Sequence, residues 1–132
     1  ILKVKAILAI TATATKQVAT TVCSSLGINS SRIIRLPVSR SNLHCTVSSD
    51  ANKEGALINL LDSKRFKPLN SIIIYVMLQK QADKLASLLR TRGHVADSYH
   101  GGKKDTIRRA VQDKFMSGKL RIVVATIAFG MG

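Results

Sequence analysis

Apolar runs separated by polar, turn-prone stretches predict a series of short strands along the chain. Two continuous runs, residues 72–76 and 120–125, are rich in β-branched side chains and are typical of strands covered on both faces of a parallel sheet. We expect the first of these two at the centre of the sheet. Shorter runs predict further strands over residues 4–10, 33–38, 43–47 and 95–99.

Helices are predicted between these strands, because apolar residues there recur three and four positions apart. The predicted boundaries are Thr15 and Gly27 for the first helix, Asp50 and the cationic stretch 64–68 for the second, and Gly93 and Gly118 as the ends of the third and fourth. Ile107, Val111 and Phe115 are expected in the core. Since strands and helices alternate through short connections, we expect an α/β fold with a mainly parallel sheet and right-handed crossovers.

Three segments that follow predicted strands carry features suited to a phosphate group. They are residues 11–15, 76–80 and 126–132, which supply threonine hydroxyls, backbone amides and glycines. Ligands of parallel sheets bind at the carboxyl ends of the strands. The polar stretch 39–42 predicts a hinge, so all three segments share one cleft only if this hinge brings the two parts of the chain together.

The composition limits the class of protein. The chain has 132 residues, which by size allows one domain at most, and its 45% apolar residues exclude a disordered tail. Only 4% of the residues are aromatic and none is Trp, which argues against a platform that stacks many bases. Cys23 and Cys45 are too few for a disulfide framework or a metal knuckle, so a reduced, intracellular protein without a metal site is expected.

The charge of the chain points to a polyanionic partner. There are 21 Lys and Arg against 7 Asp and Glu, a formal net charge of +14, and residues 1–49 contain no acidic side chain at all. The alternative is a chain whose acidic half lies in flanking sequence. No apolar run approaches the roughly 18 residues needed to cross a bilayer, so no membrane association is expected. The start of the chain lacks Met and a signal-peptide layout, which predicts a soluble, truncated chain.

The end of the chain carries a specific motif. Residues 123–132 read Val-Val-Ala-Thr-Ile-Ala-Phe-Gly-Met-Gly, which resembles motif V of the RecQ family of DNA helicases. Residues 8–14 resemble motif III of that family, and residues 38–43 resemble its interdomain Phe-Asp-Arg-Pro-Asn segment. Residues 99–102 look like its Tyr-His-Ala-Gly segment, with Arg108, Gln112 and Phe115 at the matching downstream spacings. Residues 64–75 and 88–91 are most similar to the Rothmund-Thomson branch.

The resemblance implies a RecA-like parallel sheet in each of two lobes, with ATP between the lobes and single-stranded DNA across their top. Residues 1–40 would be the C-terminal remnant of the first lobe, and residues 41–132 a partial second lobe of the helicase C-terminal type. The implied function is ATP-dependent three-prime to five-prime unwinding of DNA in replication, recombination and repair. Single-stranded and forked DNA would be the partners. The implied location is the nucleus in a eukaryote and the cytoplasm otherwise.

ATP and Mg²⁺ are the implied cofactors of the complete protein. The Walker A, acidic and arginine-finger motifs would lie outside this chain, so no stable cofactor binding and no helicase activity are expected of the chain alone. Residues 101–104 and 118–119 do not replace the Walker A loop, because they lack the G-x-x-x-x-G-K-[ST] spacing between a strand and a helix.

The resemblance also implies roles for individual residues. Thr11 and Thr13 would couple closure of the lobes to movement of the DNA strand, and the alternative is that both simply cap the helix that begins near Thr15. Thr126 would contact a DNA phosphate through its hydroxyl or its amide, with a purely structural turn as the alternative. Gly130 and Gly132 would let the backbone approach the nucleotide or the DNA closely, with turn geometry alone as the alternative.

Three further residues are candidate DNA contacts, namely His100, Lys80 and Arg108. For each of them the alternative is an ordinary solvated or structural side chain. The sequence departs from the family at residues 76–79, where Val-Met-Leu-Gln replaces Cys-Asn-Ser-Arg or a near relative. Whether Met77, Leu78 and Gln79 preserve the usual contacts with the DNA backbone therefore stays open. Lys80 is expected to supply a compensating charge.

Two other functions remain open. A non-catalytic, basic nucleic-acid-binding module with a RecA-like fold would also explain the charge of +14 and the altered residues 76–79. Such a module would bind DNA equally with and without ATP. A DEAD-box RNA helicase is the weaker alternative, because the ending Ala-Phe-Gly-Met-Gly is unlike the Arg-Gly-Ile-Asp pattern of that family.

Overall fold

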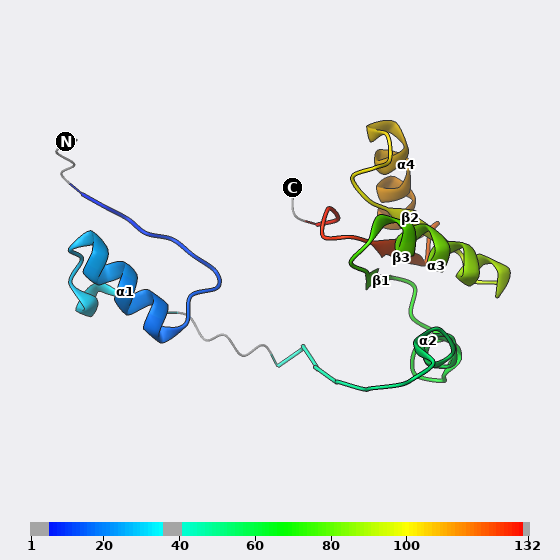
Figure 1. The fold of residues 1–132 in the computed structure, drawn as a ribbon, viewed down its shortest axis with the longest axis horizontal. Helices are drawn as coiled ribbons and strands as arrows, with labels where there is room; N and C mark the ends of the chain where they lie inside the picture. Colours follow the sequence, from blue (N-terminus) through cyan, green and yellow to red (C-terminus); the bar gives the residue numbers. More distant parts are fainter. Residues whose placement is uncertain (1–5, 36–40, 131–132) are drawn as a thin grey trace. The chain divides into compact units, whose positions relative to one another are not determined.

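The computed structural model describes residues 6–35 and 41–130, and the chain divides into two compact units (Figure 1). Unit 1 is Ile1–Thr46 and unit 2 is Val47–Gly132. The predicted hinge at residues 39–42 falls partly outside the described residues. Within the described ranges, none of the helices is long and apolar enough to cross a lipid bilayer.

Unit 1 contains the helix α1, Lys16–Leu26, and a short 3₁₀ helix η1, Ser30–Arg32. Both predicted ends of α1 are confirmed. The Thr15 hydroxyl accepts a hydrogen bond from the amide of Val18 at 3.2 Å, which makes Thr15 the N-cap. Gly27 ends the helix in the left-handed conformation with φ of 65°, a backbone geometry that glycine adopts without steric cost.

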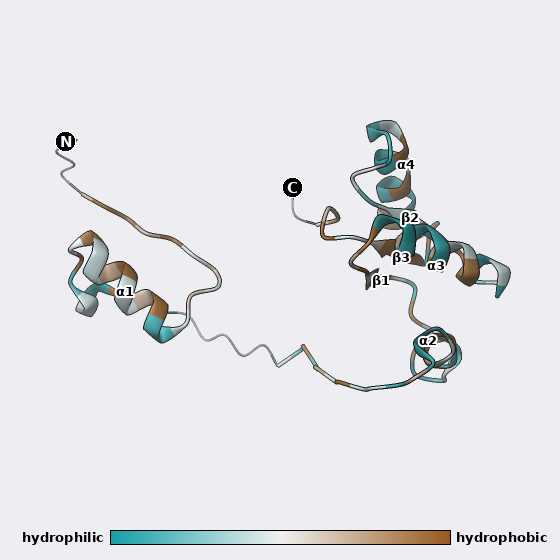
Figure 2. Cartoon of the chain, viewed as in Figure 1, coloured by the Kyte–Doolittle hydropathy of each residue, from teal (hydrophilic) through white to brown (hydrophobic). Residues whose placement is uncertain are grey.

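The strands predicted in the first part of the chain are absent from the described residues. Residues 6–10, 33–35 and 43–47 are extended or irregular and form no ladder, so those predictions are wrong, while residues 4–5 and 36–38 lie outside the description. A strand exists only where a neighbour accepts and donates its backbone hydrogen bonds. No described residue pairs with residues 6–10, although Figure 2 shows a strongly hydrophobic colour along this segment.

Unit 2 is built on a parallel sheet of three strands, β1 (Ile72–Tyr75), β2 (Ala96–Tyr99) and β3 (Ile122–Ala125), in the order β1-β3-β2. Every residue of β3 is buried, as its apolar run predicted. The expectation that β1 lies at the centre is wrong, because β1 pairs only with β3 among the described residues. Its residues alternate between half-buried and exposed, so one face of this edge strand is open.

Unit 2 has three helices: α2 (Lys53–Asp62) precedes β1, α3 (Gln79–Thr91) connects β1 to β2, and α4 (Asp105–Met116) connects β2 to β3. The predicted start of α2 at Asp50 is wrong by two residues. The side chain of Asn52 caps the helix by accepting from the amide of Gly55 at 2.9 Å, whereas Asp50 accepts from the amide of Asn52. The cationic stretch 64–68 lies beyond the helix, in the turns that lead to β1.

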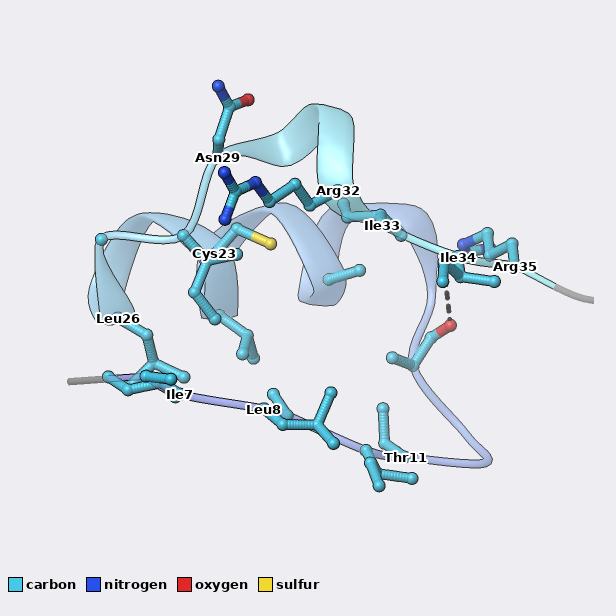
Figure 3. A pocket seen from close by; sticks show the side chains of 18 of the residues that line it. Ile7, Leu8, Thr11, Cys23, Leu26, Asn29, Arg32, Ile33, Ile34 and Arg35 are labelled. Carbon is cyan, nitrogen blue, oxygen red and sulfur yellow. Dashed lines mark hydrogen bonds between the residues drawn. The ribbon is translucent and has the colours of Figure 1, made fainter. Parts of the chain in front are cut away.

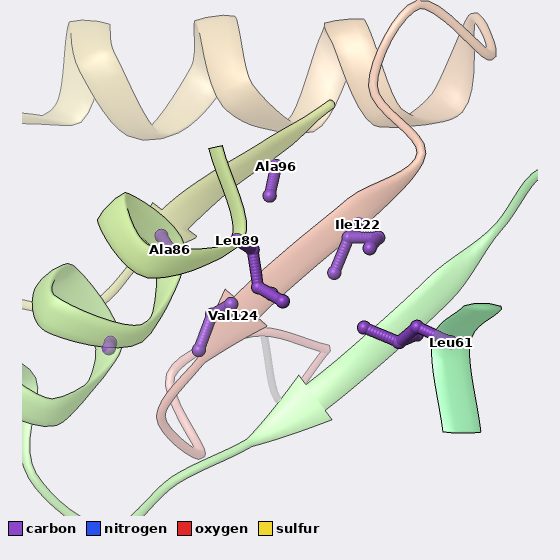
Figure 4. Close-up of a cluster of buried hydrophobic side chains, with 7 residues drawn as sticks. Leu61, Ala86, Leu89, Ala96, Ile122 and Val124 are labelled. Atoms are coloured by element: carbon purple, nitrogen blue, oxygen red, sulfur yellow. The ribbon is translucent and has the colours of Figure 1, made fainter. Parts of the chain in front are cut away.

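Two apolar clusters cover the two faces of the sheet. Alternate side chains of a strand point to opposite faces, so Ile122 and Val124 belong to one cluster and Val123 and Ala125 to the other. The first cluster packs α2 and α3 on the sheet (Figure 4), and its buried members are Leu61, Ala82, Ala86, Leu89, Ala96, Ile122 and Val124. The second packs α4 through Val111, Leu120, Val123, Ala125 and Phe129.

The core predicted for α4 is partly correct. Val111 is buried and Phe115 packs half-buried against the second cluster, but Ile107 is exposed. Ile107 lies in the first turn of α4, one turn before Val111. The expectation for Ile107 is therefore wrong, and the apolar face of the helix begins only at Val111.

Arg121 joins the turns after α2 to the start of β3. Its guanidinium donates hydrogen bonds to the backbone carbonyls of Phe66 and Leu69, each at 2.8 Å, and of Lys67 at 3.3 Å. Arg121 Nη1 also lies 3.1 Å from His94 Nδ1. One side chain thus binds several backbone carbonyls of the turns between α2 and β1.

Candidate nucleic-acid interface

The carboxyl ends of the three strands bring three loops to one edge of unit 2. Backbone hydrogen bonds extend past the strands, from the amide of Val76 to the carbonyl of Ala125 at 2.8 Å and from the amide of Thr126 to the carbonyl of Tyr99 at 3.2 Å. The loops that follow β1, β2 and β3 therefore leave the sheet side by side. This is the edge at which parallel α/β sheets bind ligands.

The loop after β3, residues 126–130, is held by aromatic side chains. The ring of Phe129 is buried and packs edge-on against Tyr99, with ring centroids 4.9 Å apart, and against Phe115 at 5.9 Å. The Tyr75 hydroxyl donates to the Phe129 carbonyl at 3.0 Å. The sequence reasoning missed this contact, although a tyrosine that ends an otherwise aliphatic strand is a signal for a directed hydroxyl.

Two of the predicted site residues lie in this loop. Thr126 is buried, and its amide is already bonded to Tyr99, so only its hydroxyl is free to meet a ligand. Gly130 has φ of 83°, and a Cβ at this position would lie 3.5 Å from the Tyr75 hydroxyl oxygen. Any side chain at Gly130 would be strained. Gly132 lies outside the described residues.

His100 begins the loop after β2 and is only 5% exposed. Its Nε2 lies 3.1 Å from Asp83 Oδ2 on α3. The other carboxylate oxygen of Asp83 accepts from the Ser98 hydroxyl at 2.5 Å and lies 3.7 Å from Lys103 Nζ. The hydrogen bond from Ser98 lowers the pKa of Asp83 below its ordinary value, and His100 and Lys103 act in the same direction against the effect of partial burial.

This network holds the ring of His100 in one orientation and leaves it buried. His100 Nδ1 is buried and has no hydrogen-bond partner among the described residues. A Cβ at Gly102 would collide with the side-chain amide of Gln79 and lie 3.2 Å from His100 Nδ1. The loop after β2 therefore passes close to the start of α3, and direct contact of His100 with DNA stays a prediction.

Lys80 and Arg108 are in different electrostatic situations. Lys80 is exposed in the first turn of α3, whose N-cap residue, Leu78, has a side chain that cannot accept from the free amides of that turn. Arg108 forms an ion pair with Asp105 one turn away on α4. The hydrogen bond to Asp105 raises the pKa of Arg108 and lowers the pKa of Asp105. Lys80 is thus the less compensated of the two charges.

Thr11 and Thr13 belong to unit 1, where they form a turn. The Thr11 hydroxyl accepts from the amide of Thr13 at 3.2 Å, and because Thr15 is the N-cap of α1, neither of the two caps that helix. Thr11 lines an open hollow of about 1200 Å³ that lies entirely within unit 1 (Figure 3). Most of its lining residues are aliphatic, such as Leu8, and Arg32 and Arg35 are the two cationic residues of its wall.

Comparison with known proteins agrees with this architecture. The helicase conserved C-terminal domain matches residues 52–132. The solved structure of Saccharomyces cerevisiae Dbp5 bound to RNA and ADP BeF3 is similar with a TM-score of 0.55 and 27% identity, over 62% of this chain and 20% of that chain. Unit 2 therefore has the α/β fold of the RecA-like C-terminal domain of helicases.

The similar sequences show to which family of helicases the chain belongs. Human ATP-dependent DNA helicase Q4 is 41% identical across 95% of this chain, and ATP-dependent DNA helicase RecQ of Bacillus subtilis is 34% identical across 96%. The chain belongs to the RecQ family of helicases. It covers 12% of the human relative and 21% of the bacterial one, so it spans between about one-eighth and one-fifth of their lengths.

Proposed function

We propose that this chain is part of an ATP-dependent three-prime to five-prime DNA helicase that acts in DNA replication, recombination and repair. Residues 1–40 would be the end of its first RecA-like lobe and residues 41–132 most of its second. The observation that carries the proposal is the shared edge of unit 2, where the loops after β1, β2 and β3 meet. In a eukaryote the protein would act in the nucleus.

Single-stranded or forked DNA would bind along this edge through its phosphates. The free amides in the first turn of α3, the ammonium of Lys80 and the hydroxyl of Thr126 are the groups suited to phosphate oxygens. Arg108 would contribute less, because its charge is shared with Asp105. His100 would hold the neighbouring loop in place through Asp83.

The nucleotide would lie where the loop after β3 presents Gly130. The absence of a side chain there lets backbone amides approach a phosphate, and Gly132 would extend the same loop. ATP would supply the free energy for movement, with Mg²⁺ balancing its phosphate charge, while Thr11 and Thr13 would couple the first lobe to this process. Dbp5, the structural relative, is bound to RNA and ADP BeF3.

The contact between Tyr75 and Phe129 would couple the DNA-binding loop after β1 to the nucleotide-binding loop after β3. Tyr75 ends β1 just before the proposed DNA-binding residues, and its hydroxyl holds the loop that contains Thr126 and Gly130. A shift of one loop would therefore be transmitted to the other through a single 3.0 Å hydrogen bond. Coupling of this kind needs two groups that move together.

The test compares Thr126→Ala with Thr106→Ala in the complete protein that contains this chain. Thr106 is an exposed threonine at the start of α4 and serves as the matched control. Loss of a charge-assisted hydrogen bond should reduce DNA-stimulated ATP hydrolysis and unwinding of a forked duplex about tenfold in Thr126→Ala. Thr106→Ala should behave as the wild type.

The competing function is a passive, basic nucleic-acid-binding module, which the charge of +14 also favours. If the complete protein bound DNA with the same affinity in the presence and absence of ATP, and neither hydrolysed ATP nor separated strands, this second function would replace the first.

A further inference from the structure

A groove of about 440 Å³ lies beside the carboxyl end of β1, between the starts of α2 and α3. Its size falls in the range of sites for small organic groups. The wall has an apolar part, formed by Tyr75, Met77 and Leu85, and a cationic part, formed by Lys53 and Lys84. The two apolar clusters of the core contain neither Tyr75 nor Met77.

The apolar part of the wall is unusually open. Met77 is 92% exposed and Tyr75 is 58% exposed, and both occupy the segment that leaves the sheet at its ligand-binding edge. An exposed thioether and an exposed ring at such an edge present polarizable surface to whatever binds there.

The charges around the groove favour an anionic ligand. Lys53 has no carboxylate within 4.0 Å among the described residues, and Lys80 adds a further exposed cation on the next helix. Lys84 lies 3.4 Å from Glu54, but both side chains are largely exposed, so water screens this pair and a phosphate can compete for the lysine. Glu54 is the one acidic group in the wall.

One ligand class combines an apolar part with an anionic part. A nucleotide of single-stranded DNA carries a flat, apolar base and an anionic phosphate, joined by a short sugar. A phosphate alone would leave Tyr75 and Met77 uncovered, and an apolar peptide would leave the lysines without partners. Base faces pack on aromatic and thioether groups regardless of base identity.

We propose that this groove binds one nucleobase of single-stranded DNA, with the base against Tyr75, Met77 and Leu85 and its phosphate on Lys84. The inference rests on the proposed function, because it requires DNA to run along this edge of unit 2. It also gives the exposed Met77 a role, namely an apolar contact with a base. The groove has one aromatic residue, so it holds a single base and is no multi-base platform.

The experiment measures how much of the affinity comes from bases. Fluorescence anisotropy of the 132-residue chain would use two labelled probes, an oligothymidylate of twelve nucleotides and a twelve-unit abasic strand with the same phosphates. We expect the wild type to bind the thymidylate about tenfold more tightly than the abasic strand, as base stacking contributes this order of effect.

Met77→Ser and Met116→Ser form a matched pair of variants. Both methionines are exposed, 92% and 77%, but Met116 ends α4 and does not line the groove. Met77→Ser should lower the affinity ratio of the two probes severalfold, while Met116→Ser should keep the wild-type ratio. Lys84→Gln should weaken binding of both probes equally, because it removes a phosphate contact only.

Several outcomes would overturn the base site. These are a ratio near one in the wild type, an unchanged ratio in Met77→Ser, and loss of the base preference when flanking sequence is restored, which would mean that the protein itself covers the groove. Each of these leaves the proposed helicase function in place. Conversely, a clear base preference combined with an absence of ATP-driven unwinding in the complete protein would refute the helicase and keep the base site.

Discussion

Units 1 and 2 have similar apolar sequences but bury them very differently. Among the described residues, Cys23 is the only buried hydrophobic residue of unit 1, and all the others belong to unit 2. Leu8 of unit 1 is 84% exposed, whereas Leu89 of unit 2 is fully buried. The difference lies in the neighbours that each apolar side chain finds, because the residue types are the same.

A helix does not require neighbours from distant parts of the chain. The helix α1 forms in unit 1 with both its caps, since Thr15 and Gly27 act on adjacent backbone groups. Residues 6–10 carry a strand pattern and remain unpaired, because a strand depends on hydrogen bonds from distant parts of the chain. The aliphatic hollow beside α1 is thus a surface on which further structure of the proposed first lobe would pack.

The strongest test of this contrast replaces one leucine in each unit with alanine. Leu89→Ala should destabilise unit 2 by about 3 kcal/mol, because it leaves a cavity in the first cluster. Leu8→Ala should change the free energy of unfolding by less than about 0.5 kcal/mol. Urea denaturation followed by circular dichroism would measure both values.

Equal losses of stability in the two variants would contradict the contrast. They would mean that Leu8 is packed in solution as closely as Leu89. Amide hydrogen exchange gives an independent check, since β3 should exchange only through global unfolding of unit 2 and residues 6–10 should exchange freely.

The network around Asp83 exists only in unit 2 and should make its stability depend on pH. The folded pKa of Asp83 is below its ordinary value of 3.8, so the carboxylate stabilises the fold above the unfolded pKa. This contribution is lost as the pH falls through the folded pKa. Asp83→Asn should cost about 1 kcal/mol at pH 7, a modest value because the side chain is half exposed.

The measurement is the urea midpoint of the wild type and Asp83→Asn between pH 7 and pH 2. Their difference should be constant at neutral pH and shrink below pH 4. Asp113→Asn, on the exposed side of α4, is the control and should show no such convergence. If the difference in urea midpoint stayed constant from pH 7 to pH 2, the charge of Asp83 would not contribute to the stability of unit 2.

The smallest effect is expected at the cap of α1. Thr15→Ala should destabilise this helix locally by about 1 kcal/mol or less and leave the unfolding midpoint of unit 2 unchanged. Thr20→Ala is the matched control, because its hydroxyl bonds to the Lys16 carbonyl inside the helix and caps nothing. NMR chemical shifts of α1 would report both. A shift in the unit 2 midpoint would show that the two units fold together.

The sequence predicted those features that depend on near neighbours. The ends of α1, the buried strand β3 and the apolar faces of α3 follow from caps and periodicity, and all are confirmed. The start of α2 was wrong because Asp50 and Asn52 are both good caps two residues apart. The position of β1 at the edge could not be predicted, since its apolar run is the same whether one or two strands flank it.

The same limit applies to the candidate site. The edge loops after β1 and β3 could be predicted from the alternation of strands and helices, whereas His100 and the role of Thr126 came from the motif resemblance. The hydrogen bond from Tyr75 to Phe129 and the pair of Asp83 with His100 join residues on different elements. Their geometry depends on how helices pack on the sheet, which no local pattern records.

The hydrogen bonds of Arg121 tie the turns after α2 to the start of β3. They restrict the movement of α2 relative to the strands. A spectroscopic label at exposed Asn59 on α2 would consequently record the orientation of the whole sheet-bearing body. Distance measurements between such a label and added DNA would therefore report the position of unit 2 as a whole.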